Sequence, residues 1–126
     1  MQLVKNEKKY WNFILELRNH RTVKLGFIKQ HLITEEEHTS FMKRHGTCYY
    51  ICLIDDNPAG FVGVVNKDIR VATHPDYQKR GVGKFMIKKL INLHPNSFAK
   101  IDVSNEASFK LFESCGFKKK YYILEK

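Results

Sequence analysis

Residues 68–91 constrain the fold of this chain more than any other stretch, because a strand, a glycine-containing turn and an amphipathic helix follow one another directly. Gly81 and Gly83 tolerate backbone angles that other residues avoid, and they let a ligand approach the main chain. The first turn of a helix leaves N–H groups that can bind an anion. Positive charge is added by three side chains of the turn, Lys79, Arg80 and Lys84. The segment therefore predicts a site for a phosphate or pyrophosphate group.

Two common phosphate-binding motifs do not fit the spacing of this turn. A mononucleotide-binding loop has a glycine five residues before its Gly-Lys pair and a Ser or Thr directly after it. Here Gln78 and Phe85 occupy those two positions. A dinucleotide-binding fingerprint has a third glycine three residues after the second, and Met86 stands there instead. Both of these nucleotide-binding designs are therefore excluded.

The length and composition of the chain indicate a single soluble, globular domain. The 126 residues suffice for one hydrophobic core, so we expect a single domain over residues 1–126. A hydrophobic content of 43% is typical of folded globular proteins. No apolar run approaches the roughly 20 residues of a membrane span, and the N-terminus lacks the apolar core of a signal peptide. We expect a cytoplasmic protein without membrane contact.

Charge and cysteine content narrow the range of partners. The three cysteines and six histidines show no metal-ligand spacing, so no metal is expected. A net charge of +9 favours anionic partners, among them a phosphate-rich cofactor, an acidic substrate or nucleic acid. Nucleic-acid binding needs a clustered basic face with a reading helix or stacking aromatics, which the sequence does not display. A non-catalytic basic domain that binds acyl-CoA or nucleic acid stays as an alternative of another class.

The hydrophobic pattern predicts an order of two helices, three antiparallel strands, a helix, a strand, a helix and a strand. The expected helices are 6–18, 34–44, 82–93 and 105–115. The expected strands are 47–54, 61–65, 68–74, 99–103 and 120–124, with a short additional strand at 2–5. Thr34 and Glu37 have the spacing of a capping box, and Gly116 is placed to end the last helix in the left-handed conformation.

Two segments resemble the signature motifs of the GNAT superfamily of N-acetyltransferases. The first is Gln78-x-x-Gly81-x-Gly83, which follows a strand ending in His74-Pro75, and the second is Asn-x-Ala-Ser-x-x-Leu-Phe-x-x-x-Gly-Phe at residues 105–117. The resemblance covers the predicted element order from end to end. It implies an α/β (α+β) GNAT fold, in which helices cover both faces of a mixed, mostly antiparallel sheet that is splayed between strands four and five. It also implies direct attack of a primary amine on acetyl-CoA, the cosubstrate, without a metal.

The resemblance further implies which residues bind coenzyme A. The pantetheine arm is expected along the main chain of strand four, at Val71, Ala72 and Thr73. The pyrophosphate is expected on the turn, at Gln78, Lys79, Arg80, Gly81, Val82, Gly83 and Lys84. The next helix contributes Asn105 and Ser108. Asn105 has an alternative role as the N-cap of its own helix.

The residues that move protons depart from the family pattern. The family's usual acid is a tyrosine, and Phe112 stands at the matching position. Tyr121 is the expected substitute; the alternatives are Tyr122, Tyr77, Ser108 and solvent. The family's usual base is a glutamate on strand four, where the alignment places Lys67, with Asp68 one residue away. The expected bases are Asp68 and, on the second helix, His38; Glu36 and Glu37 of the same helix are alternatives.

The acceptor is expected to be bound by the first two helices. Leu17-Arg-Asn19 and Glu36-Glu-His38 resemble segments of acetyltransferases that act on amino groups of nucleotide-linked sugars. This implies a small-molecule amine, an amino sugar or a phosphate-bearing, nucleotide-linked amino sugar. Its diphosphate would need Arg or Lys partners, for which Arg18, Arg21 and Lys24 are the candidates. The alternative acceptor is a protein or peptide amine, either an N-terminus or a lysine. The sequence leaves open whether the protein is a monomer or a homodimer.

Overall fold

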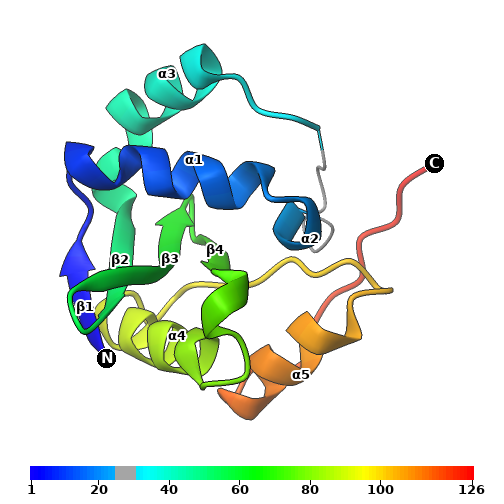
Figure 1. The fold of residues 1–126 in the computed structure, drawn as a ribbon. Coiled ribbons are helices and arrows are strands. Elements are labelled where there is room, and N and C mark those ends of the chain that lie inside the picture. The colour runs from blue at the N-terminus through cyan, green and yellow to red at the C-terminus, as the bar shows by residue number, and fades with distance from the viewer. Residues whose placement is uncertain (25–30) are drawn as a thin grey trace.

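A four-stranded antiparallel sheet with the order β1-β2-β3-β4 forms the centre of the molecule (Figure 1). The computed structural model describes residues 1–24 and 31–126. The strands are β1 (Gln2–Lys5), β2 (Tyr49–Ile54), β3 (Asn57–Val65) and β4 (Asp68–Thr73). β2, β3 and β4 follow each other in the chain, and β1 pairs with the outer side of β2. β4 therefore lies at one edge of the sheet.

Helices cover both faces of this sheet, as Figure 1 shows. One face carries α1 (Trp11–Asn19) and α3 (Glu35–His45), with the short α2 (Arg21–Lys24) after α1. The other face carries α4 (Val82–Leu93) and α5 (Glu106–Ser114). Three short 3-10 helices complete the described elements: η1 (Lys8–Tyr10), η2 (Gly46–Cys48) and η3 (Pro75–Tyr77). The expected fold class, an antiparallel sheet between helices, is confirmed.

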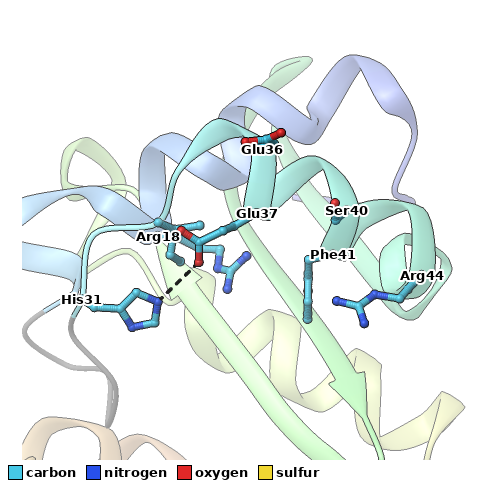
Figure 2. A pocket seen from close by; sticks show the side chains of 8 residues that line it. Arg18, His31, Glu36, Glu37, Ser40, Phe41 and Arg44 are labelled. Atoms are coloured by element: carbon cyan, nitrogen blue, oxygen red, sulfur yellow. Dashed lines mark ion pairs between the residues drawn. The ribbon is translucent and has the colours of Figure 1, made fainter.

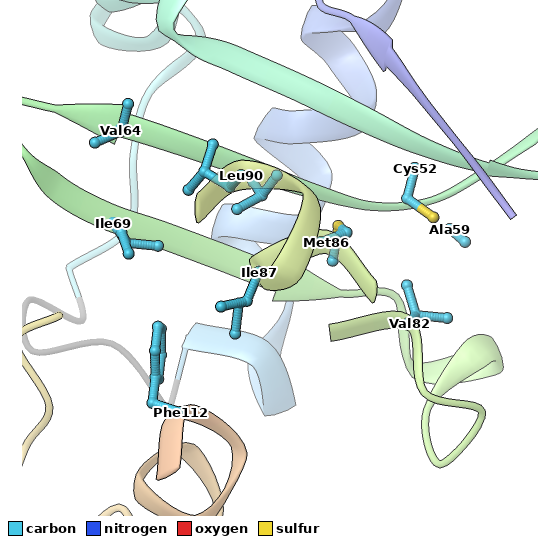
Figure 3. Close-up of a cluster of buried hydrophobic side chains, with 10 residues drawn as sticks. Cys52, Ala59, Val64, Ile69, Val82, Met86, Ile87, Leu90 and Phe112 are labelled. Atoms are coloured by element: carbon cyan, nitrogen blue, oxygen red, sulfur yellow. The ribbon is translucent and has the colours of Figure 1, made fainter. Parts of the chain in front are cut away.

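The sheet has a hydrophobic cluster on each face, because successive residues of a strand point to opposite sides. On β2, Ile51 packs with the α1 and α3 side, and its neighbour Cys52 packs with α4. On β3, Phe61 and Val62 divide in the same way. Figure 3 shows the α4 side, where Met86 and other apolar residues of α4 lie against the strands. Burial on both faces explains why these strands read as nearly continuous apolar runs.

The β2–β3–β4 meander is closed by two tight turns. Asp55 and Asp56 have φ angles of 51° and 64°, and Asn66 and Lys67 have φ angles of 53° and 68°. Two-residue turns with positive φ at both positions match the twist of the flanking strands. The connection between the expected strands 47–54 and 61–65 is thus shorter than predicted, because β3 begins at Asn57.

Local signals in the sequence place most helix ends correctly. Glu37 donates its N–H to Thr34 Oγ1 at 3.1 Å, and Thr34 donates its N–H to Glu37 Oε1 at 3.3 Å, which completes the expected capping box. Gly116 has a φ of 94°, as expected for the residue that ends α5. The first helix differs from the prediction, since a 3-10 turn precedes α1 and the regular helix begins only at Trp11.

The predicted strands 99–103 and 120–124 are absent from the structure. Just before residues 99–103, a single parallel bridge joins Phe98 to Asp68. Ile69 donates its N–H to the Phe98 carbonyl at 2.9 Å, and Phe98 donates to the Lys67 carbonyl at 2.8 Å. The chain then leaves β4, so no ladder forms. Residues 120–124 have strand-forming side chains but no neighbouring strand in the structure.

Gly60 is a position where the packing of the sheet admits no side chain. A Cβ at Gly60 would lie 2.7 Å from the Ala72 carbonyl oxygen and 2.8 Å from Met86 Cε. Because the first of these atoms belongs to the backbone, β3 and β4 would have to separate. We expect Gly60→Ala to lower the free energy of unfolding by about 1–3 kcal/mol, measured by urea denaturation.

Gly46→Ala is the matched control for this substitution. Its Cβ would meet atoms only at 3.7 Å or more, and its φ of −57° suits alanine. We therefore expect its stability to equal or slightly exceed that of the wild type. Equal destabilisation by the two variants would contradict the proposed role of Gly60.

Candidate active site

The edge of β4 offers main-chain groups to a ligand. His74 donates its N–H to the Ala59 carbonyl at 2.8 Å, so every second residue before it, including Ala72, points toward β3. Val71 and Thr73 point the other way, as Ile69 does when it bonds to Phe98. The open edge thus presents the N–H and C=O groups of Val71 and Thr73. Ala72, expected beside them, has its polar groups in the ladder with β3.

α4 begins at Val82, shortly after β4 and η3, and no side chain caps the N–H groups of its first turn. The first N–H that bonds within the helix is that of Phe85, which donates to the Gly81 carbonyl at 3.0 Å. The N–H groups of Val82, Gly83 and Lys84 precede it and have no helical acceptor. Gly81 provides no side-chain cap, and the first turn contains no acidic residue. This end of α4 therefore suits an anion.

The two glycines of the motif are required for different reasons. Gly81 has a φ of 78°, and a Cβ there would meet no atom within 4 Å, so the position needs glycine for its conformation and is open outward. A Cβ at Gly83 would lie 3.0 Å from Leu111 Cδ2 and 3.8 Å from Thr73 Oγ1. Gly83 therefore lets α4 approach both α5 and β4 closely.

The remaining residues of the turn surround this helix end with positive charge. Gln78, Lys79, Arg80 and Lys84 are all exposed. Lys79 has a φ of 64°, and the guanidinium of Arg80 lies 5.5 Å from the ring centroid of Tyr77. Val82 differs from its neighbours, because its side chain is buried in the core and only its main chain faces the turn.

α5 packs beside α4. The side chain of Asn105 caps α5 by accepting the N–H of Ser108 at 3.1 Å. The capping role considered for Asn105 is thus present. Phe112, at the position of the family's tyrosine, is 4% exposed and packs edge-on against Phe117. Tyr77, one of the alternative acids, is partly buried and packs against the same hydrophobic cluster as Phe112.

Asp68 and Tyr121, both expected to move protons, lie in different surroundings. Asp68 is half-buried at the start of β4, on the same strand face as Ala72, which packs with the α1 and α3 cluster. Tyr121 follows α5 in a stretch without regular structure, and its side chain is 89% exposed. The structure does not bring Tyr121 into a site.

His38, the second expected base, is part of the core between α1 and α3. It is 3% exposed, and both of its ring nitrogens have partners. Nε2 lies 2.7 Å from the Trp11 carbonyl and therefore donates, while Nδ1 lies 3.2 Å from Arg18 Nη1 and accepts. Burial lowers the pKa of the imidazole. A neutral ring with both nitrogens bonded has no lone pair for a substrate ammonium, so His38 positions Arg18 instead.

A group of residues that sequence reasoning did not assemble lies beside His38. The guanidinium carbons of Arg18 and Arg70 lie 4.8 Å and 5.8 Å from the ring centroid of Phe41. The buried phenol of Tyr49 is adjacent; burial raises its pKa, and the charges of Arg70 and Arg18 oppose that shift. The sequence signal that could have pointed to this group was Arg70, because a charged residue is unusual in a strand that is covered on both faces.

A cavity of about 530 Å³ opens next to this group, between α3 and the segment before it. It is lined by Arg18, His31, Ile33, Glu36, Glu37, Ser40, Phe41 and Arg44. In Figure 2, Arg18 and Arg44 point toward Phe41 from its two sides, while Glu37 faces His31, whose Nε2 is 4.0 Å from Glu37 Oε2. Ligand pockets of small molecules have volumes of roughly 300–1,000 Å³, so the cavity has the size of a substrate site.

The described residues contain no cluster of three or more His, Cys, Asp or Glu side chains that could hold a metal ion. Within the same residues, no helix is both long and apolar enough to cross a bilayer.

Comparison with known families decides what this arrangement is. The model of the acetyltransferase (GNAT) family matches residues 11–117. The chain belongs to the acetyltransferase (GNAT) family. As a GNAT enzyme it is an N-acetyltransferase, and acetyl-CoA is its cosubstrate. A comparison of the sequence with curated proteins finds no match.

Solved structures share the GNAT fold at low sequence identity. Spermidine N-acetyltransferase of Vibrio cholerae, solved with CoA and spermine, is 19% identical and has a TM-score of 0.81 over 99% of this chain and 85% of that chain. Ribosomal-protein-alanine N-acetyltransferase of Brucella melitensis is 14% identical, with a TM-score of 0.82 over 94% and 85%. The protein yncA of Salmonella typhimurium, solved with acetyl-CoA, is 18% identical, with a TM-score of 0.78 over 93% and 79%.

The environment of His38 makes the stability of this GNAT domain depend on pH. The folded pKa lies below the ordinary value of 6.5, so the unfolded chain takes up a proton first as pH falls. This part of the stability is complete above pH 6.5 and declines below it. We expect the free energy of unfolding to fall between pH 7.5 and about 5.5, measured by urea denaturation.

Substitution separates this contribution from that of other groups. His38→Gln should flatten the pH dependence in this window and cost about 1–3 kcal/mol at pH 7.5, because the bonds to Trp11 and Arg18 are disturbed. His31→Gln, which changes an exposed histidine, should keep the slope. An unchanged slope in His38→Gln would show that another group controls it.

Proposed function

We propose that acetyl-CoA binds along the open edge of β4 with its pyrophosphate at the N-terminus of α4. The fit is supported by the uncapped N–H groups, the outward-open Gly81 and the absence of an acidic residue in the first turn of α4. The main chains of Val71 and Thr73 would pair with the pantetheine arm. Acetyl-CoA bound there supplies an activated acetyl thioester.

The positive side chains of the turn have distinct tasks in this proposal. Lys79, Arg80 and Lys84 neutralise the pyrophosphate. Gln78, the first residue of the motif, also belongs to the proposed binding turn. Arg80 also lies over the Tyr77 ring, which restrains its guanidinium. In the same proposal, Asn105 and Ser108 at the start of α5 contact the cosubstrate.

We propose that the acceptor is a small primary amine, an amino sugar or a nucleotide-linked amino sugar, that enters from the side of α1 and α3. The observation that supports this is the cavity of about 530 Å³, whose lining mixes arginines with glutamates. Arg70 links the cavity to the donor edge, because it contacts Phe41 and directly precedes Val71 on β4. Holding amine and thioester together is worth up to about 7–11 kcal/mol of the barrier in well-oriented systems.

Asp68 is the residue we propose as the base that deprotonates the acceptor ammonium. Its side chain is half-buried and forms no ion pair with any residue that the structure describes. It also lies two positions from Arg70 on the same strand face. No side chain is assigned as the acid, because Phe112 is a core residue and Tyr121 lies outside the site.

The donor site is tested by reversing one charge at the start of α4. Lys84 and Lys88 are both exposed on this helix, but only Lys84 is in its first turn. We expect Lys84→Glu to weaken CoA binding at least about tenfold in calorimetric titration, which corresponds to ~1.4 kcal/mol. The change should not harm the fold, since a glutamate near a helix N-terminus is favourable.

Lys88→Glu is the control, because it makes the same charge change one turn further along α4. Its affinity for CoA should stay close to that of the wild type. Equal losses in the two variants would point to a general charge effect, and undiminished affinity in Lys84→Glu would refute the placement of the pyrophosphate.

The role of Asp68 is tested by the pH dependence of acetyl transfer. General-base catalysis typically contributes about 10²–10⁴-fold, so Asp68→Asn should lower kcat/KM by that factor and remove the acidic limb of its pH profile. Asp102→Asn, at an exposed carboxylate that bonds to Ser104, is the control. A wild-type profile in Asp68→Asn would assign proton removal to solvent.

The nature of the acceptor is tested with a panel of amines. Release of free CoA from acetyl-CoA would be followed with amino sugars, polyamines and peptides that have free N-termini or lysines. We expect amino sugars to be the best acceptors. A preference for peptides would favour the alternative acceptor, a protein or peptide amine, and would assign the acidic start of α3 to peptide binding.

A further inference from the structure

Arg18 and Arg70 come from different elements to the same aromatic ring. Arg18 lies on α1 and Arg70 on β4, and their guanidinium carbons lie 4.8 Å and 5.8 Å from the centroid of Phe41. Both side chains are half-buried. Two like charges are therefore held close together in a partly desolvated place, which costs free energy unless an opposite charge is near.

No carboxylate of the described residues supplies that opposite charge by an ion pair. Their ion pairs are Lys9–Glu7, His31–Glu37 and His74–Asp76. The charge of Glu37 acts on Arg18, but the Glu37 carboxylate is bound to the N–H and hydroxyl of Thr34 in the capping box. Burial lowers the pKa of Arg18, and the charge of Arg70 contributes to that shift.

The orientation of the two guanidiniums is set by neighbours that do not neutralise them. Arg18 donates one N–H to His38, whose other nitrogen is tied to the Trp11 carbonyl. The neutral imidazole of His38 and the ring of Phe41 hold the guanidinium of Arg18 in place but carry no negative charge. Arg44, exposed at the same cavity, points toward Phe41 as well (Figure 2). The contacts to His38 and Phe41 fix the position of the Arg18 guanidinium, and Glu36 and Glu37 are the acids that line the same cavity.

We propose that Arg18 and Arg70, with Phe41 between α1 and β4, form a subsite for an oxyanion of the acceptor, a carboxylate or a phosphate. Guanidinium groups bind such groups with paired, charge-assisted hydrogen bonds. The subsite adjoins the cavity of about 530 Å³, which has room for the rest of the acceptor. The inference rests on the proposed function, because it names the acceptor class as amines that carry an anionic group.

The position on β4 explains how the subsite serves the reaction. Arg70 directly precedes Val71, whose main chain faces the open edge, while the side chain of Arg70 faces α1 and α3. An acceptor anchored at Arg70 is therefore held beside the donor edge.

The direct test observes the two arginines by nuclear magnetic resonance. Protein saturated with CoA, so that the α4 site is filled, is titrated with phosphate, acetate or chloride at constant ionic strength. The Nε–H signals of Arg18 and Arg70 are assigned with Arg18→Lys and Arg70→Lys. We expect saturable shifts of both signals with phosphate or acetate, and the anion that binds more tightly identifies the acceptor's group.

Linear shifts that chloride reproduces, or no shifts, would overturn the subsite. Because the signals belong to the two arginines, this outcome can be read even if CoA does not bind at α4. It is therefore independent of the proposed donor site.

The second test compares two acceptors that differ only in an anionic group. Glucosamine 6-phosphate should have a KM at least about tenfold below that of glucosamine, and Arg70→Gln should remove this ratio. Lys43→Gln, a change at an exposed residue of α3 outside the cavity, should keep it. Equal KM values with turnover of both amines would refute the subsite and leave the acetyltransferase proposal intact. Saturable arginine shifts without turnover of either amine would support the subsite and contradict the proposal that the acceptor is an amino sugar.

Discussion

A strand that is hydrogen-bonded on one side only keeps half of its main-chain groups available to a partner. β4 is such a strand, because the chain that bonds to it at Phe98 leaves after a single bridge. The proposed donor site depends on this open edge, and α4 begins near its end with uncapped N–H groups. The proposed acceptor side depends on the same strand, since Arg70 extends from it to Phe41. One unpaired edge therefore organises both halves of the site.

The parts of the fold that depend on neighbours in sequence were predictable. The capping box of Thr34 and Glu37 and the left-handed Gly116 are local, and the structure has both. The strands expected at 99–103 and 120–124 were wrong because a strand needs a partner as well as suitable side chains. That partner is set by tertiary structure, which a pattern of apolar residues does not record.

The role of a residue, unlike its type, also depends on tertiary structure. His38 has the chemistry of a base, but only the fold shows that Trp11 and Arg18 occupy both of its nitrogens. The turn proposed to bind the pyrophosphate stands out in the sequence because its signals, Gly81 and Gly83, lie close together in the chain. Arg18 and Arg70 are 52 positions apart in the chain, so their common contact with Phe41 appears only when α1 and β4 are brought together.

The bare start of α4 also has a thermodynamic consequence. A helix whose first N–H groups lack a side-chain cap is incomplete until something negative occupies that end. If the pyrophosphate is that group, the cosubstrate is the missing helix cap, and the loaded protein is more stable than the empty one. Mass action makes this gain ~2.7 kcal/mol when the free ligand is at about 100 times its Kd. Resistance to unfolding and to proteases would then follow the acetyl-CoA level around the protein.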